Sequence, residues 1–310
     1  MNRWNWPEMM QIDTCLENAL AHDPGDLRIP MTALLQAGGK RIRPILTMLA
    51  AQTDSGYSAQ ASARLATAVE LIHSATLIHD DIVDHSLLRR GEVTIFHHSG
   101  TKQAVRIGDY YFGKAGEILA GLANQQVTQT ILDAVDKVCH SQLQEFQSRG
   151  MPIGIDTYIS IVRGKTASLL SAACAAGALL SGAPNPIVRA LASYGDGLGI
   201  AFQMTDDALD FSDQSGKPLG QDLKEGVLSL PLILAHLDPH LKPRLEAGMA
   251  PGGNLAEVAR LLAQSGILQQ VIEAARQWRD RALDALTVIP QGSVRQRLEF
   301  LAQFAVDRSY

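Results

Sequence analysis

Apolar residues recur at intervals of three and four positions along most of this chain, and this periodicity limits its fold more than any other feature. The pattern is typical of helices that bury one face. The same stretches are rich in Ala, Leu, Gln and Glu, which favour helix. Convincing alternating strands with hairpin turns are absent from the sequence. The clearest helical segments are residues 112–124, 126–148, 157–181, 187–211 and 255–287.

Short clusters of Pro and Gly separate these segments and indicate turns. None of the clusters is long enough to be a domain linker. We therefore expect an all-α fold, with one domain of ten or more helices over residues 1–310. The clusters lie at residues 22–30, 148–154, 181–186, 212–220 and 249–254.

Composition excludes several classes of protein. The net charge is −5, with 27 basic and 32 acidic residues, which gives no reason to expect a nucleic-acid partner. Three cysteines without CxxC spacing, Cys15, Cys139 and Cys174, indicate reduced thiols in a cytoplasmic protein. The first residues lack the profile of a signal peptide, and no window reaches the roughly 18 apolar residues that a membrane span needs.

Two aspartate triads share one spacing. Residues 80–84 read DDIVD and residues 206–210 read DDALD, each at the end of an apolar helical run. Residues at i and i+4 of a helix share a face, so Asp80 and Asp84 point the same way, as do Asp206 and Asp210. One such triad is equally well explained as a solvated helix end, but two are not. Clustered carboxylates repel one another unless a cation lies between them, and their hard oxygen ligands favour Mg²⁺.

Basic residues flank both triads. Lys40, Arg41 and Arg43 follow a Gly pair in "GGKRIRP", and Arg89 and Arg90 follow the first triad. Guanidinium groups bind phosphate oxygens in bidentate fashion, and lysines act as point charges. Any one of these bases alone would be read as an ordinary surface residue. Together with Lys165 and Lys217 near the second triad, they indicate a site for diphosphate.

Five blocks in this order resemble the trans-prenyltransferases of the polyprenyl diphosphate synthase family, long-chain type. They span residue 38 to about residue 232 and read "GGKRIRP", "LIHSATLIHDDIVDHSLLRRG", "GKTA", "FQMTDDALDF" and "GKPLGQDLKEG…LSLP". The resemblance implies a helical bundle around a deep central cavity, two or three Mg²⁺ ions per site, and a homodimer. It also implies two substrates, isopentenyl diphosphate and an allylic prenyl diphosphate, and a lipophilic product.

The resemblance also implies a role for individual residues. Asp80, Asp84 and Asp206 would bind the metal ions, with Asp81, Asp207 and Asp210 in or near the shell. The allylic diphosphate would be held by Arg89, Lys165 and Lys217, with Thr166 beside it. Isopentenyl diphosphate would be held by Lys40, Arg43, His73 and Arg90, with Arg41 as a further candidate. Gln203 would lie close to the reacting carbons.

The sequence departs from the family pattern at two places. Val227 stands where the family usually has a lysine near the allylic diphosphate, and Ser141, Gln142 and Glu145 stand where the family often reads GExxQ. Neither departure changes a metal ligand. They bear on rate and substrate preference more than on the type of reaction.

The residues before the first triad bear on product length. Ala75 lies five positions before Asp80, where family members with short products often carry a bulky aromatic residue, and the small Thr76 follows it. Successive turns back from Asp80 place Ala75, Ile72, Leu71 and Ala68 along one side. We therefore expect a growing chain to pass Ala75 and to be stopped deeper, by Ile72 or by a residue of the 126–148 segment. The predicted product has five or more isoprene units, in the range of six to ten.

Four other interpretations compete. A shorter-chain farnesyl or geranylgeranyl diphosphate synthase would share every motif. An HD-type metal phosphohydrolase could use His73, His79, Asp80 and Asp206, but it leaves the other aspartates and "GGKRIRP" unexplained. A terpene cyclase needs no second diphosphate site. A non-catalytic subunit of a heteromeric synthase finds support only in Val227.

Overall fold

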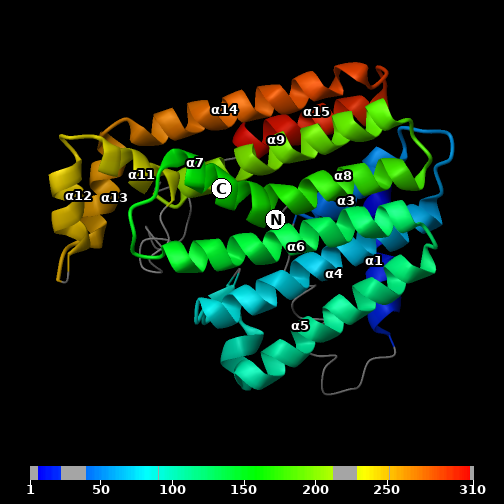
Figure 1. Cartoon of the computed structure of the whole chain (residues 1–310), viewed down its shortest axis with the longest axis horizontal. Helices are drawn as coiled ribbons and strands as arrows, with labels where there is room; N and C mark the ends of the chain where they lie inside the picture. Colours follow the sequence, from blue (N-terminus) through cyan, green and yellow to red (C-terminus); the bar gives the residue numbers. More distant parts are fainter. Residues whose placement is uncertain (1–5, 22–39, 90, 212–228, 251, 308–310) are drawn as a thin grey trace. The chain divides into compact units, whose positions relative to one another are not determined.

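The structure is a computed structural model that describes residues 6–21, 40–89, 91–211, 229–250 and 252–307. More than ten α-helices account for most of these residues, which confirms the all-α fold (Figure 1). The helices are α1 (Pro7–Leu20), α3 (Ile42–Ala51), α4 (Ala59–Val83), α5 (Ile95–Gly121), α6 (Gln125–Ser148), α7 (Ile155–Val162), α8 (Ser168–Leu180), α9 (Asn185–Leu209), α11 (Leu230–Leu237), α12 (Lys242–Met249), α13 (Leu255–Gln264), α14 (Ile267–Ala285) and α15 (Ser293–Asp307).

The chain divides into two compact units. The first consists of Met1–Asp133 and Ala172–Arg189, and the second of Ala134–Ser171 and Ala190–Tyr310. Each aspartate triad therefore belongs to a different unit. The single domain expected over the whole chain, and its central cavity, stay predictions.

Helix α4 is the central element of the first unit. It packs against α1, α3 and α5, and α5 runs beside it (Figure 1). Small residues and β-branched residues let α4 bury more than one face, from Ala63 to Ile78. A helix that is buried on most sides is held in place by packing rather than by its own propensity. The aspartates at its end thus extend from a fixed support.

A short hairpin follows α4. Strand β1 (Leu88–Arg89) pairs antiparallel with β2 (Glu92–Val93), and Arg89 lies opposite Glu92. The sequence did not predict these strands. Two residues per strand are too few to show an alternating pattern.

Helices α9, α14 and α15 form one part of the second unit, where the Tyr194 hydroxyl of α9 donates to the Leu298 carbonyl of α15 at 2.7 Å. Helices α11, α12 and α13 pack together beside α14. The predicted helical segment 255–287 is two helices, because Gly266 adopts a left-handed φ of 79° that ends α13. The predicted segment 157–181 is also interrupted, by a π-helix (η1) over Arg163–Ala167.

Among the described residues, no helix is long and apolar enough to cross a membrane.

Helix α9 approaches η1 closely at Gly199, where a Cβ atom would lie 2.4 Å from the Ala167 Cα.

We expect Gly199→Ala to lower the free energy of unfolding by about 1–3 kcal/mol, because the added methyl group would force α9 away from η1. Gly116→Ala is the matched control. It adds the same group to α5 where no atom lies within 4 Å, so it should stabilise the helix by about 0.5–1 kcal/mol. Urea unfolding followed by circular dichroism measures both changes. Equal effects of the two substitutions would contradict the close approach.

Candidate functional site

The first aspartate triad occupies the C-terminal end of α4. Asp84 caps the helix, and its backbone N–H donates to the Asp80 carbonyl at 2.8 Å. The relation of i to i+4 therefore holds to the last residue of the triad. Asp81 is buried, and Asp80 and Asp84 are half-buried.

The second triad repeats this arrangement at the end of α9. The Asp210 N–H donates to the Asp206 carbonyl at 3.0 Å, one residue past the end of the helix. Asp207 is buried, and Asp206 and Asp210 are half-buried. The two triads lie on different helices, and in each of them a buried carboxylate lies between two accessible ones.

The position of both triads disfavours negative charge. The C-terminal end of a helix carries a partial negative charge, so carboxylates there are destabilising. The described last turns of α4 and α9 contain no basic residue to offset them. A bound cation would offset both the repulsion and the helix dipole, and carboxylate oxygens suit Mg²⁺. Within the described ranges, no group of three or more His, Cys, Asp or Glu side chains is arranged to hold a metal by itself.

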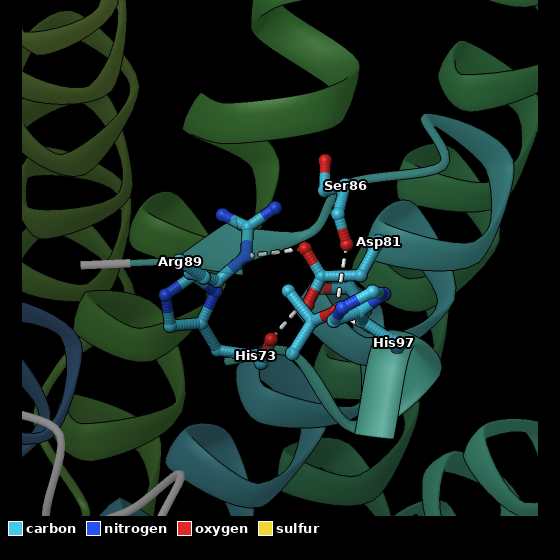
Figure 2. A network of polar contacts seen from close by, with 7 residues as sticks. His73, Asp81, Ser86, Arg89 and His97 are labelled. Atoms are coloured by element: carbon cyan, nitrogen blue, oxygen red, sulfur yellow. Dashed lines mark hydrogen bonds and ion pairs between the residues drawn. The ribbon is translucent and has the colours of Figure 1, made fainter. Parts of the chain in front are cut away.

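Asp81 is held by Arg89 (Figure 2). The Arg89 Nε donates to the Asp81 Oδ1 at 2.7 Å, and the two side chains are 29 % and 4 % exposed. The hairpin is tied to α4 near this pair, because the Ser86 N–H donates to the Asp81 carbonyl and the Thr94 hydroxyl donates to the Ser86 carbonyl. Arg89 is therefore fixed beside the first triad, as the sequence predicts.

Asp207 is held by three hydrogen bonds. The Tyr158 hydroxyl and the Leu230 N–H donate to its Oδ2 at 2.7 and 3.0 Å, and the Gln203 amide donates to its Oδ1 at 3.0 Å. Burial raises the pKa of the Asp207 carboxyl to about 6, although the three hydrogen bonds lower it, and the nearby Asp206 raises it further. Asp207 thus joins α9 to α7 and to the first turn of α11.

Two of the predicted substrate-binding residues lie on η1. A π-helix adds a residue to one turn and is frequent at functional sites. Lys165 forms an ion pair with Glu145 of α6, and the Thr166 hydroxyl donates to the Gln203 Oε1 at 3.1 Å. Gln203 therefore links Thr166 to Asp207. A Cβ atom on Gly164 would lie 1.7 Å from the Ser141 Oγ, so η1 contacts α6 closely there.

The basic residues that begin α3 contact α4. Arg41 caps α3 with a left-handed φ of 48°, and its guanidinium forms a buried ion pair with Glu70. Arg43 Nη1 lies 3.1 Å from the His73 Nε2. Lys40 is half-buried and immediately precedes them.

The residues expected to set product length follow one another on α4. Ile72 and Ala75 are buried, at 3 % and 0 % exposed. Thr76 is half-buried, and its hydroxyl donates to the His73 carbonyl at 2.8 Å. Whether this side of α4 borders a growing chain stays a prediction.

The structure brings some of the predicted residues into direct contact within each unit. In the first unit Arg43 contacts His73 and Arg89 contacts Asp81. In the second unit Thr166, Gln203 and Asp207 are joined by hydrogen bonds. Three positions, Arg90, Lys217 and Val227, lie outside the described residues.

Sequence reasoning missed two partners, Glu70 and Tyr158. Glu70 had a signal, because it is an acid within an apolar helical run and three residues before His73. A carboxylate in such a position needs a partner. Tyr158 had none, since the contact joins residues 49 positions apart.

The hydrogen bond from Tyr158 predicts a pH-dependent stability. The pKa of Asp207 rises from 3.8 to about 6 on folding, so stability falls as pH rises between these values. Tyr158→Phe removes a donor to the charged form and raises the folded pKa further. We therefore expect its cost to grow as pH rises through 6, reaching about 1–3 kcal/mol at pH 8.

Urea unfolding in metal-free buffer at pH 5 and pH 8 measures this cost. Tyr194→Phe is the control, because it removes a hydrogen bond to a backbone carbonyl, which does not titrate. Its cost should be the same at both pH values. A cost of Tyr158→Phe that does not change with pH would contradict this account of Asp207.

Known proteins are similar to this chain along nearly its whole length. The family described as polyprenyl synthetase matches residues 25–262. A heptaprenyl diphosphate synthase component 2 from Geobacillus stearothermophilus is 35% identical, over 98% of this chain and 96% of the relative.

Two solved structures share the fold. A polyprenyl synthase from Caulobacter crescentus, solved with calcium and isoprenyl diphosphate, is 33% identical and has a TM-score of 0.89, over 98% of this chain and 95% of the other. A geranylgeranyl pyrophosphate synthase from Lactobacillus brevis is 29% identical with a TM-score of 0.89, over 98% of each chain. This chain therefore belongs to the polyprenyl synthetase family and is a prenyltransferase.

Proposed function

We propose that this enzyme condenses isopentenyl diphosphate with an allylic prenyl diphosphate, head to tail and in trans geometry, to give a long-chain polyprenyl diphosphate. The observation that carries the proposal is the repeated aspartate triad at the end of two helices, with its accessible outer carboxylates and its buried middle one. The names of the relatives support the same chemistry.

Asp80, Asp84 and Asp206 would hold two or three Mg²⁺ ions, with Asp210 as a further ligand. Their chemistry fits, because hard oxygens at the negative ends of α4 and α9 favour a hard cation. When bound, the ions supply positive charge to the diphosphate oxygens. The relative solved with calcium and isoprenyl diphosphate supports a site that binds a divalent ion and substrate together.

The basic residues would hold the two diphosphates. Arg89 and Lys165 each lie against a carboxylate, Asp81 and Glu145 respectively. These carboxylates hold the charged ends of Arg89 and Lys165 in place before the substrate binds. Less conformational entropy is then lost when the substrate binds. We assign Arg89 and Lys165 to the allylic diphosphate, with Lys217. Lys40, Arg43, His73 and Arg90 are assigned to isopentenyl diphosphate.

The reaction would begin when the allylic carbon–oxygen bond breaks and its electron pair leaves with the diphosphate. The double bond of isopentenyl diphosphate then attacks the allylic cation and forms the new carbon–carbon bond. The released diphosphate takes the proton that is lost, since no side chain is an obvious base. Arg89 and Lys165 would stabilise the charge on the leaving group, and such electrostatic stabilisation is usually the largest catalytic term.

We expect strict dependence on Mg²⁺. Asp84→Ala and Asp206→Ala should each reduce turnover of isopentenyl and farnesyl diphosphates by about a hundredfold or more, because each removes a metal ligand from a charged transition state. Circular dichroism should show unchanged helix content. Near-normal turnover of either variant in chelator-treated buffer would contradict the proposal, and release of phosphate without isopentenyl diphosphate would favour a phosphohydrolase.

The fold alone does not explain product length, so individual side chains must set it. The relatives include a heptaprenyl and a geranylgeranyl diphosphate synthase, and both match along nearly the whole chain. We propose that the growing product passes Ala75, whose small side chain would leave room for it about one turn before the first triad. A growing chain gains roughly 0.8 kcal/mol for each methylene that it buries along such a wall.

Ala75→Phe should shorten the product sharply and keep the chemistry, because the ring would block the side of α4 that the chain follows. Leu77→Phe is the control, since residue 77 is half-buried and lies about 200° around the helix from residue 75. It should leave the product unchanged. Chromatography of the dephosphorylated products decides between them. A wild-type product no longer than farnesol, or an unshifted Ala75→Phe product, would refute this account.

We also propose a homodimer in the cytoplasm. Exposed apolar residues on α6, Leu132, Leu143 and Phe146, support a protein interface, with exposures of 51 %, 61 % and 56 %. The relative named as a component of a synthase keeps a heteromer as the alternative. The small number of cysteines supports the location.

A further inference from the structure

Two contacts join the start of α3 to one face of α4. Arg41 pairs with Glu70, and Arg43 lies against His73. Glu70 and His73 are three residues apart, so they are neighbours on the helix surface. The segment with Lys40, Arg41 and Arg43 is therefore attached to α4 at two successive points.

The first contact holds a strained backbone. Arg41 has a φ of 48°, in the left-handed region. A residue with a side chain pays about 1–2 kcal/mol for this conformation, and it persists only where its surroundings impose it. Arg41 stands between Lys40 and Ile42, the first residue of α3, so its left-handed conformation bears on where Lys40 and Arg43 lie.

The same contact is out of reach of solvent. The side chains of Arg41 and Glu70 are 4 % and 7 % exposed. Buried charges of this kind need each other, because the loss of one partner leaves the other charge uncompensated. The positive charge of Arg41 is thus largely neutralised inside the first unit.

We propose that Glu70 is a positioning residue, which acts through Arg41 to hold the left-handed turn and so sets Lys40 and Arg43 for the diphosphate of isopentenyl diphosphate. This inference rests on the proposed function and deepens it. It gives Arg41 a structural task in place of the direct substrate contact expected from sequence. The allylic site gains nothing from the pair.

The test is direct binding of isopentenyl diphosphate and of farnesyl diphosphate, measured by calorimetry with Mg²⁺ on the full chain. Glu70→Gln removes the charge, and Glu70→Asp keeps the charge but withdraws it by one methylene. Both substitutions should lower the affinity for isopentenyl diphosphate by about tenfold or more, on the scale of one charge-assisted contact. The affinity for farnesyl diphosphate should change by less than about twofold.

Thr67→Val is the matched control. Thr67 is buried one turn earlier on α4, and its hydroxyl donates to the Ala63 carbonyl of the same helix. Thr67→Val removes this hydrogen bond within α4 and keeps both Arg41 and Glu70. It should leave both affinities within about twofold of wild type. Thermal melting of every variant separates lost folding from lost positioning.

The exchanged pair, Arg41→Glu with Glu70→Arg, distinguishes a tether from a direct contact. If the ion pair only holds the turn in place, the exchanged pair should recover most of the affinity for isopentenyl diphosphate that Glu70→Gln loses. If Arg41 itself touches the diphosphate, the exchanged pair stays weak, and that result overturns the inference. Unchanged isopentenyl diphosphate binding in Glu70→Gln and Glu70→Asp, or equal weakening of both substrates, overturns it as well.

Failure of the proposed function gives a different result. A wild-type chain that binds isopentenyl diphosphate without turnover would refute the proposed reaction, and the affinities of the Glu70 variants would still decide the inference. A wild-type chain that does not bind isopentenyl diphosphate leaves no site to position, and it refutes the inference. If Glu70→Gln does not fold, the affinities of Glu70→Asp for the two substrates decide the inference.

Discussion

The rest of the site depends on an unfavourable placement of charge. Each of two helices ends in three aspartates, where the helix dipole is negative and where the carboxylates repel one another. The described last turns of the two helices themselves contain no basic residue, and Arg89, which pairs with Asp81, comes from the hairpin that follows α4. In the proposed function, a cation that arrives with a diphosphate would offset the negative charge. Binding of metal and substrate would then stabilise the chain at these helix ends.

The middle aspartate of each triad shows how the fold tolerates this charge. Asp81 is paired with Arg89, and Asp207 accepts three hydrogen bonds. Arg89 belongs to the hairpin beyond α4, and two of the three donors to Asp207 belong to α7 and α11, whereas Gln203 lies on α9 itself. The middle carboxylates therefore fasten each helix end to its surroundings, and the outer ones stay accessible. One short motif thus has a structural role in its middle residue and a proposed chemical role in its outer ones.

The sequence predicted the features that repeat. Helices follow from a periodicity sustained over many residues, and the triads follow from one spacing that occurs twice. The hairpin, the π-helix and the break at Gly266 each involve only a few residues, too few for a period to show. Tyr158 could not be predicted because only the folded chain brings it to Asp207, whereas Glu70 was detectable as an acid in an apolar run. The sequence thus predicts candidate residues for the site, but it does not predict the contacts that hold them in place.

Thermal melting of Asp80→Asn and Asp81→Asn, with and without Mg²⁺ and farnesyl diphosphate, tests this division of tasks most directly. The account predicts that Asp80→Asn changes the melting temperature without ligand less than Asp81→Asn does, because it relieves repulsion among the carboxylates at the end of α4. The same variant should lose most of the rise in melting temperature that metal and diphosphate give the wild type. Asp81→Asn should melt at a lower temperature without ligand, because Arg89 loses its ion pair. An Asp80→Asn variant that is destabilised without ligand as much as Asp81→Asn and still responds fully to metal and diphosphate would contradict the account.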